Sequence, residues 1–499
     1  MVLQVALLGL DLGTSSAKAL VCDTEGRVLG EGQHGYPVGV PCRDWVETSP
    51  EDWWRAAVLA VRQALSSVRE PVQCLAIVGQ MHGVVLTGST GAALRPAILW
   101  SDGRSRDEAA ALRALPATLL AQIGNEPVTG MAGCTLLWLQ RHEPDRYLAA
   151  RWALQPKDWL RYQLTGRAGS DASDASGTLL FDLRERRWAR EVLEAIGIDV
   201  QILPPLNRAS EIAGTLCSQA AEELGLPGGL PVAMGASDTA SALEAAGLEG
   251  GVEALLTLGT GGQLVVRERS CPNGVARRSN VYCAAEETSW YRLAAAQNVG
   301  LALDWVRRLL GATWEQLYKA CSLLRHDSPI FVPYLVGERW ETGTRAGWYG
   351  LGVEHARDDL LASALEGVAF LLRKRLDDLV WNGLRPTELV LAGGGVQSAP
   401  WRDYLLGVLG TKARSAGTMS LSARGAVLLA GVAGGTYGSL NEARTTVPAA
   451  ATLEAGDADT MDRGRYERFV ELVDGSSGAT PARSAVPAQH DREPGHRGS

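Results

Sequence analysis

Short apolar runs, each bounded by glycine-rich or polar turns, recur along the first hundred residues. Such runs are typical of strands buried in a sheet. A helix is predicted from residue 50 to about residue 68, because Ser49 suits the N-cap, Pro50 suits the first helical position and Asp52 can reach back to the cap. Strands that alternate with helical stretches in this way predict an α/β domain. The predicted strands are 5–10, 18–22, 74–78, 84–87 and 96–100.

The pattern changes near residue 247. Segment 247–251 is rich in glycine and is the best candidate for a domain boundary. Predicted strands at 253–258 and 263–267 flank a Gly-Thr-Gly-Gly turn, which repeats the start of the chain: an apolar strand, Leu-Gly-Thr with two small residues, and a second strand. One short repeat of this kind is limited support for a duplication. A fold of two lobes with a phosphate-binding loop in each would, however, contain such a repeat.

The length of 499 residues suits two domains of roughly 200–250 residues each, since single cores rarely grow larger. We expect an N-terminal domain over 1–247 and a C-terminal domain over 248–472. A disordered tail is expected over 473–499, where Gly, Ser, Pro and Ala dominate and aromatic residues are absent.

Composition excludes several classes of protein. The net charge of -8 argues against a non-specific grip on nucleic acid, and no apolar run approaches the ~20 residues of a membrane span. The apolar start lacks the basic flank and cleavage site of a signal peptide. Eight scattered cysteines without a C-x-x-C pair give neither a zinc site nor a redox motif, so free thiols in a reducing cytoplasm are expected.

Three turns rich in small residues are candidates for binding phosphate groups, which need backbone N–H donors and close approach of the backbone. No G-x-x-x-x-G-K-[ST] sequence is present, and Asp11 stands where a Rossmann motif needs glycine. Each turn alone is more often an ordinary hairpin. An adjacent acid adds weight, because a carboxylate repels phosphate unless a cation bridges them. The turns are 11–16, 258–262 and 392–395.

In this order the motifs resemble the sugar kinases of the FGGY family, and the likeness covers residues 3–472. Within the family the chain is most similar to the xylulokinases, for which the run Gln80-Met81-His82-Gly83 is the most specific sign. The resemblance implies an α/β fold of two actin-like (ribonuclease H-like) ATPase domains with a catalytic cleft between them. The other matching segments are 9–15, 97–104, 138–144, 156–160, 170–178, 235–240, 258–261 and 348–367.

The resemblance implies that Asp238 is the catalytic base. By position alone, after an apolar strand at 231–235 and before a helix at 239–246, it would be interpreted as an N-cap aspartate. The two roles are compatible, because a helix N-terminus keeps a carboxylate ionised and fixed, as a base must be.

The resemblance also implies a sugar pocket. Met81 and His82 match the sugar-binding pair of the xylulokinases, and Thr239 matches an asparagine that the family uses against the substrate. Asp102 could hydrogen-bond sugar hydroxyls. Trp100, which ends a predicted strand beside Asp102, is a further candidate, although core packing is the alternative for it.

ATP and Mg²⁺ are the implied cofactors. Asp11 is counted with the catalytic residues and would hold Mg²⁺ through water. The residues expected at the nucleotide are Gly13, Thr14 and Ser15 in the first turn, Gly259, Thr260 and Gly261 at the phosphates, and Gly393, Gly394 and Gly395 along the adenosine.

Two departures bear on the exact substrate and the rate. Thr135 stands where the family usually has lysine. Gly337-Glu338-Arg339 is followed by Trp340-Glu341-Thr342, where the family usually has Thr-Pro and a loop rich in His and Asn.

The expected activity is ATP-dependent phosphorylation of a ketopentose, with D-xylulose and its C5 hydroxyl preferred. One alternative is a kinase for another ketose or a polyol. A catalytically silent sensor of sugar or nucleotide is disfavoured by the presence of both Asp11 and Asp238. A plain ATPase is disfavoured by segments 80–83 and 100–104, which suit a sugar pocket. The expected partners are a small sugar and ATP, with neither nucleic acid nor membrane, and a homodimer is left open.

Overall fold

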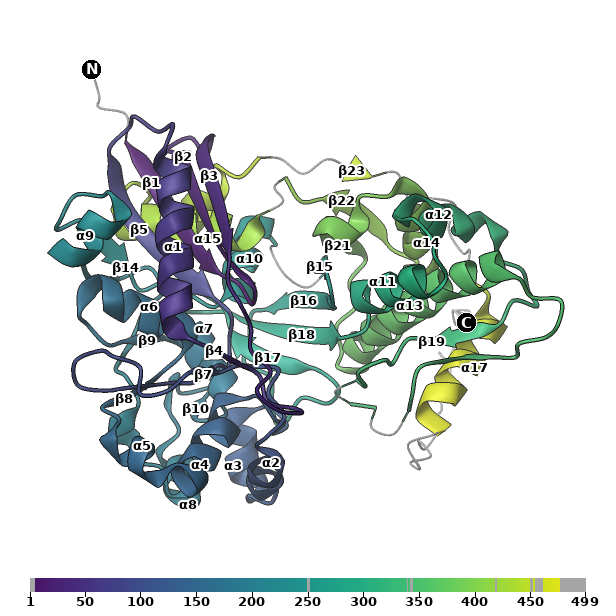
Figure 1. The fold of residues 1–499 in the computed structure, drawn as a ribbon, viewed down its shortest axis with the longest axis horizontal. Coiled ribbons are helices and arrows are strands. Elements are labelled where there is room, and N and C mark those ends of the chain that lie inside the picture. Colours follow the sequence, from purple (N-terminus) through teal and green to yellow (C-terminus); the bar gives the residue numbers. More distant parts are fainter. Residues whose placement is uncertain are drawn as a thin grey trace, which may run out of the picture.

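The chain forms two lobes, each built around its own sheet (Figure 1). The computed structural model describes residues 5–248, 252–338, 340–341, 344–417, 420–448, 452–453 and 461–475. The predicted α/β architecture of two lobes is confirmed.

The first lobe contains a six-stranded sheet in the order β13-β14-β5-β1-β2-β3. Strand β1 is antiparallel to β2 and parallel to β5, so the turn at 13–15 joins two neighbouring strands at the edge of the cleft described below. The strands are β1 (Ala6–Leu12), β2 (Ser16–Asp23), β3 (Val28–Gly35), β5 (Val72–Gly79), β13 (Ile212–Thr215) and β14 (Pro231–Ala233).

The second lobe contains a seven-stranded sheet in the order β17-β18-β16-β15-β21-β22-β23. Strands β18-β16-β15-β21-β22-β23 have the same order and directions as β3-β2-β1-β5-β14-β13 of the first sheet. The repeat seen in the two turns therefore extends to the whole sheet. The strands are β15 (Glu253–Leu258), β16 (Gly262–Glu268), β17 (Asn280–Cys283), β18 (Trp290–Ala296), β21 (Glu388–Ala392), β22 (Lys412–Ser415) and β23 (Thr452–Leu453).

Short strand pairs and helices complete both lobes. The strand pairs are β4 (Glu47–Thr48) with β7 (Ala97–Ile98), β6 (Val85–Thr87) with β8 (Trp152–Leu154), β9 (Ser170–Asp171) with β12 (Leu206–Asn207), β10 (Phe181–Asp182) with β11 (Arg187–Trp188), and β19 (Ile330–Val332) with β20 (Gly347–Tyr349). The α-helices are α1 (Pro50–Leu65), α2 (Arg106–Arg113), α3 (Ala117–Ile123), α4 (Ala132–His142), α5 (Pro144–Ala149), α6 (Pro156–Thr165), α7 (Ala172–Ala175), α8 (Arg190–Ile196), α9 (Ser218–Leu224), α10 (Asp238–Ala246), α11 (Gly300–Leu309), α12 (Trp314–Lys319), α13 (Arg357–Trp381), α14 (Ala399–Leu409), α15 (Leu421–Ala433), α16 (Leu440–Arg444) and α17 (Arg463–Asp474). The 3-10 helices are η1 (Ser176–Thr178), η2 (Val200–Ile202), η3 (Ala320–Leu323) and η4 (Gly394–Val396).

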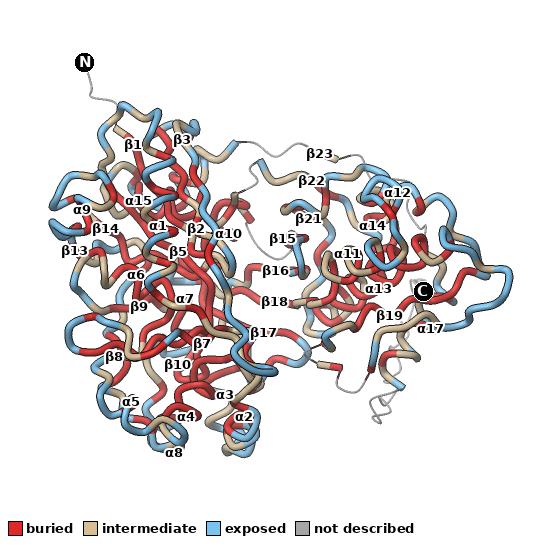
Figure 2. The backbone as a smooth tube through the Cα atoms, in the orientation of Figure 1, coloured by how far each residue is buried: buried red, intermediate tan, exposed pale blue. Residues whose placement is uncertain are grey.

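Helix α15 returns from the end of the chain to the first lobe, where it packs against β1 and α10 (Figure 1). The contact is close: a Cβ on Gly9 of β1 would lie 2.3 Å from the carbonyl oxygen of Ala423, and one on Gly425 would lie 2.0 Å from that of Ser241. One buried cluster accordingly contains side chains from both halves of the chain, among them Leu7 and Val427. Figure 2 shows the buried strands and helices at the centre of each lobe.

Strand β17 ties the second sheet to the first lobe. The side chain of Asn125 accepts the backbone N–H of Val281 at 2.8 Å and donates to its carbonyl oxygen at 2.7 Å, as a neighbouring strand would. The backbone N–H of Cys283 donates to Ser176 Oγ at 3.0 Å. Neutral hydrogen bonds therefore join the lobes on this side of the cleft.

Several local predictions need correction. Helix α1 ends at Leu65, and Ser49 makes no side-chain cap because its hydroxyl donates to the Glu51 carboxylate instead. Strand β7 ends at Ile98, so Trp100 lies beyond it. The joint at 249–251 and nearly all of the tail at 473–499 lie outside the described residues, while helix α17 continues through Asp474.

All eight cysteines are free. Among the described residues, no helix is long and apolar enough to cross a membrane.

Candidate functional site

A cleft of about 2310 Å³ is lined by side chains from both lobes. It brings together most of the residues that the sequence singles out. The predicted site residues in its lining are Asp11, Thr14, Ser15, Met81, His82, Trp100, Asp102, Asp238, Thr239, Gly259, Thr260, Gly261 and Gly393, whereas Gly13, Gly394 and Gly395 are not part of the lining.

Asp238 is the first residue of α10, and its side chain faces the cleft. The N-cap is Ser237, whose hydroxyl accepts from the backbone N–H of Ala240 at 3.4 Å, so the interpretation of Asp238 as the N-cap is wrong by one residue. Asp238 Oδ1 accepts from the backbone N–H of Thr239 at 2.6 Å and from its hydroxyl at 3.1 Å. Burial raises the pKa of Asp238 to about 6 although these hydrogen bonds lower it. A carboxyl group with this pKa can take up a proton near neutral pH.

Asp11 ends the apolar part of β1, opposite Lys18 of β2. Burial raises the pKa of Asp11 to about 7, with a further increase from the charge of Asp238 and a decrease from Lys18. Its Oδ1 is buried without a hydrogen-bond partner among the described residues. A desolvated carboxyl group in the lining of a cleft suits a hydrated cation such as Mg²⁺. No group of three or more potential metal ligands is found in the described residues, so any cation there would rely on water and phosphate oxygens.

Met81 and His82 are both buried in the cleft wall. His82 Nδ1 lies 2.7 Å from the carbonyl oxygen of Gly177, and since a carbonyl only accepts, this nitrogen carries the proton. The backbone N–H of His82 donates to Gln155 Oε1 at 2.9 Å. A Cβ on Gly177 would lie 2.8 Å from Met81 Cε and 3.0 Å from the imidazole, so glycine is needed there to leave room for the pair.

Asp102 is buried, and its carboxylate is fully engaged within the protein. Oδ1 accepts from the backbone N–H and Nε of Arg104, each at 2.9 Å, and Oδ2 accepts from the backbone N–H of Val46 at 2.6 Å and from Arg104 Nη2 at 2.8 Å. A carboxylate has about four acceptor positions, and these four bonds fill them. Asp102 therefore lines the cleft but is bonded to its own lobe, while neighbouring Trp100 donates from Nε1 to Thr14 Oγ1 at 3.1 Å.

The turn at 259–261 rests on the N-terminus of α11. The backbone N–H groups of Gly300 and Leu301 donate to the carbonyl oxygens of Gly259 (3.2 Å) and Thr260 (2.9 Å). A Cβ on Gly300 would lie 2.3 Å from the Gly259 oxygen, so only glycine permits this approach. The N-terminus of α11 therefore holds the turn, and a glycine turn that lets the backbone approach closely suits phosphate groups.

The turn at 393–395 packs against the end of β15. Gly393 has a φ of +90°, and a Cβ there would lie 2.3 Å from the carbonyl oxygen of Leu258. A Cβ on Gly395 would lie 2.8 Å from Leu258 Cβ, whereas Gly394 faces open space. Two of the three glycines are thus needed to bring this turn beside the 259–261 turn.

Three residues of the site were given no role of their own from the sequence, although Gln80 and Gly177 lie within the matching segments 80–83 and 170–178. Lys18 lines the cleft beside Asp11, and Gln80, buried at 2% exposure, lines it beside Met81. Gly177 shapes the pocket without lining it. Lys18 carried a signal, since it stands in the strand after a candidate phosphate turn, but the contact of Gly177 with His82 depends on the tertiary fold.

The two departures lie in different settings. Thr135 is buried within α4, away from the cleft lining. Trp340 lines the cleft, whereas Glu341 is buried and pairs with Arg375 Nη2 at 2.6 Å. The second departure therefore combines a cleft residue with one end of a buried ion pair.

Comparison with known proteins supports one family for the whole chain. Residues 6–244 match the N-terminal domain of the FGGY family of carbohydrate kinases, and residues 254–434 match its C-terminal domain. Xylulose kinase of Escherichia coli K12 is 32% identical over 451 residues, 88% of this chain and 93% of the relative, and that of Bacillus subtilis 168 is 28% identical over 447 residues, 87% and 90%. Among solved structures, a xyloylose kinase from Brucella ovis is 30% identical with a TM-score of 0.84 (94% and 98% covered), and xylulose kinase from Rhodospirillum rubrum is 26% identical with a TM-score of 0.81 (95% and 97% covered).

Proposed function

The chain belongs to the FGGY family of carbohydrate kinases, and we propose that it transfers the γ-phosphoryl group of ATP to the C5 hydroxyl of D-xylulose. One observation carries the proposal: a desolvated carboxyl group, Asp238, shares a cleft with the buried Met81–His82 pair and with the 259–261 turn. The names of the relatives support xylulose as the acceptor. In this proposal, residues 1–247 bind the sugar and supply the base, and residues 248–472 bind the nucleotide.

Asp238 accepts the proton of the attacking hydroxyl. The two hydrogen bonds from Thr239 hold Oδ1, so the carboxylate keeps one orientation while Oδ2 serves as the base. A pKa of about 6 leaves most of the group ionised at neutral pH and still basic enough to accept a proton.

The sugar lies against Met81 and His82. Because Nδ1 of His82 is held by Gly177, the other ring nitrogen is an acceptor for a hydroxyl in the neutral imidazole. Thr239 and Trp100 border the same space. Asp102 shapes the pocket through Arg104 and Val46, because its own acceptor positions are filled.

The nucleotide lies across the second lobe, with its phosphates at Gly259, Thr260 and Gly261 and its adenosine along 393–395. Asp11, through water, and Lys18 face the phosphates from the first lobe. Mg²⁺, when bound, would neutralise the charge on the phosphate oxygens. Closure of the lobes excludes water, which protects ATP from hydrolysis.

A coupled assay of ADP release across a panel of ketoses and polyols tests the proposal. We expect the highest kcat/KM for D-xylulose. A higher value for another ketose or a polyol would change the substrate, and ADP release that needs no acceptor would indicate a plain ATPase.

Eight free thiols and the use of ATP are compatible with a cytoplasmic enzyme.

A further inference from the structure

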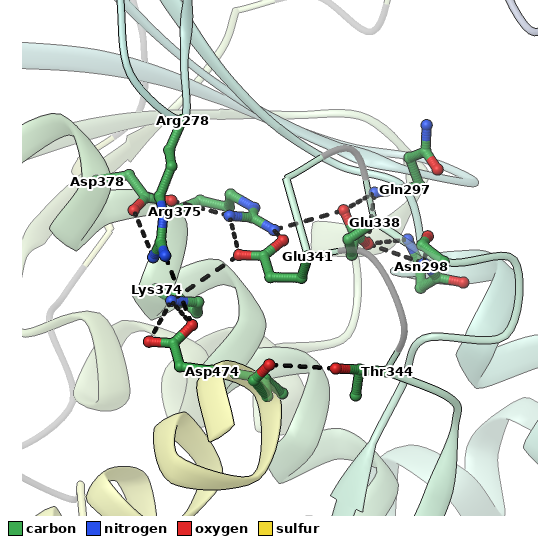
Figure 3. Close-up of polar contacts among 12 residues, drawn as sticks. Arg278, Gln297, Asn298, Glu338, Glu341, Thr344, Lys374, Arg375, Asp378 and Asp474 are labelled. Carbon is green, nitrogen blue, oxygen red and sulfur yellow. Dashed lines mark hydrogen bonds and ion pairs between the residues drawn. The ribbon is translucent and has the colours of Figure 1, made fainter. Parts of the chain in front are cut away.

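A buried ionic cluster in the second lobe includes residues of the cleft lining, among them Glu338 and Asp378. Figure 3 shows its polar contacts. At its centre is Arg375 of α13, which is fully buried and pairs with Glu341 through Nη1 (3.0 Å) and Nη2 (2.6 Å). The same guanidinium contacts Asp378 Oδ2 at 2.8 Å and Glu338 Oε2 at 3.6 Å. Because buried charges are costly unless they are paired, these contacts fix the positions of the carboxylates relative to α13.

Glu338 connects this cluster to the backbone that precedes α11. Its carboxylate accepts from the backbone N–H of Gln297 at 2.9 and 3.1 Å and from that of Asn298 at 3.0 Å. It also accepts from Asn298 Nδ2 at 2.8 Å. One carboxylate therefore satisfies two consecutive backbone donors and one amide, and Figure 3 shows all of these groups turned toward Glu338.

Residues 297 and 298 lead directly into α11, on which the 259–261 turn rests. The hydrogen bonds from Gly300 and Leu301 to Gly259 and Thr260 leave the turn little freedom. On the other side of the turn, a Cβ on Gly261 would lie 2.8 Å from the carbonyl oxygen of Ala296. A shift of the 296–298 backbone must therefore move the turn as well.

We propose that Glu338 is a positioning residue for the 259–261 turn, and that Arg375 holds Glu338 in place from α13. The inference rests on the proposed function only in taking this turn as the phosphate site. Backbone N–H groups bind phosphate well when they are already aimed at it, so an error in the turn weakens binding of phosphates and leaves the rest of the nucleotide unaffected.

Glu338→Gln tests the proposal. The amide keeps one acceptor oxygen but places an NH₂ group against backbone donors, and it removes the charge that pairs with Arg375 at 3.6 Å while Glu341 and Asp378 remain its partners. We expect the Kd for ATP and for ADP to rise roughly ten-fold, which corresponds to the free energy of one charge-assisted hydrogen bond. The Kd for adenosine and the KM for D-xylulose stay within about two-fold, since neither ligand needs the turn. Calorimetric titration measures the binding constants.

Glu366→Gln is the matched control. Like Glu338, Glu366 is buried and contacts an arginine, here Arg465 Nε at 2.9 Å. Glu366 lies on α13, and Arg465 reaches the 326–329 segment rather than α11. This variant should lower the melting temperature as Glu338→Gln does, with ATP and ADP binding unchanged.

Two results would overturn the inference: unchanged ATP and ADP affinity in Glu338→Gln, or equal weakening of ATP, ADP and adenosine, which indicates general loosening of the lobe. Wild-type protein that binds ATP with the expected response to Glu338→Gln, yet phosphorylates no sugar, would support the positioning role and contradict the proposed function.

Discussion

Asp11 of strand β1 and Asp238, which begins helix α10, line the same cleft, and the negative charge of Asp238 contributes to the raised pKa of Asp11. Burial raises both pKa values, to about 7 for Asp11 and about 6 for Asp238. Two desolvated carboxyl groups in the lining of one cleft are unfavourable for folding, and a site for a proton and a cation explains their presence.

Asp238→Asn keeps the shape of the side chain but cannot accept a proton. We expect turnover to fall roughly 10²–10⁴-fold. ATP affinity should be nearly unchanged, because the turns of the second lobe hold the nucleotide. Steady-state kinetics and titration with ATP measure the two effects.

Asp199→Asn is a control for this variant. Asp199 also accepts from a nearby backbone N–H, that of Gln201 at 2.9 Å, but it is exposed and does not line the cleft. Its turnover should equal that of the wild type. Retention of more than about a tenth of wild-type turnover in Asp238→Asn, a rise of only ~1.4 kcal/mol in the barrier, would exclude Asp238 as the base.

The pH dependence of activity follows from the same carboxyl group. A base must be ionised, so kcat/KM should fall as pH decreases through about 6, the pKa of Asp238. Rates measured from pH 5 to 8 at saturating ATP check this. A profile that stays flat down to pH 5 would contradict the raised pKa.

Stability should have the opposite dependence. A raised pKa means that the folded state binds more protons than the unfolded chain between pH 3.8, the ordinary pKa of an aspartate, and about pH 6. The contribution of Asp238 to stability therefore falls as pH rises through this range. Asp238→Asn removes that loss. The melting temperature of the variant minus that of the wild type should therefore be roughly 2–4 °C larger at pH 8 than at pH 4. The same difference at both pH values would indicate that the ionised carboxylate is not destabilised by burial.

His82→Asn tests the sugar pocket. His82 has a φ of +72°, a conformation that asparagine adopts more readily than alanine does, so this variant changes the ring with little backbone strain. Loss of one hydrogen bond to a desolvated hydroxyl should raise the KM for D-xylulose on the order of ten- to a hundred-fold, with ATP binding intact.

His34→Asn is the matched control, because His34 Nδ1 also lies near a glycine carbonyl, that of Gly35 at 2.9 Å, on an exposed strand outside the cleft. If the KM for D-xylulose is equal in both variants, sugar recognition lies elsewhere in the cleft.

Trp340→Thr tests whether the ring of Trp340 limits the size of the acceptor. Glu341 should be left intact, because removing one partner of the buried pair with Arg375 costs about 3–5 kcal/mol and would obscure the result. If Trp340 narrows the cleft, the variant should accept larger ketoses or polyols with little change for D-xylulose. An unchanged substrate ranking would mean that the ring only packs against the neighbouring lobe.

Local signals in the sequence predicted much of the fold. The strand at 253–258 and the start of α1 at Pro50 follow from apolar runs and helix-start residues that need no distant partner. The cleft residues were identified from the family resemblance, since each glycine turn alone was ambiguous. The pairing of Asp102 with Val46 and of Glu341 with Arg375 joins segments far apart in the chain, so only the tertiary structure reveals it.

The most direct test of the central claim is product analysis after incubation of D-xylulose with ATP and Mg²⁺, in which ADP and sugar phosphate are both quantified. The account predicts one ADP for each D-xylulose phosphorylated at C5, with Asp238→Asn giving neither product above roughly a hundredth of the wild-type rate. ADP without sugar phosphate, or phosphorylation at full rate by Asp238→Asn, would contradict it.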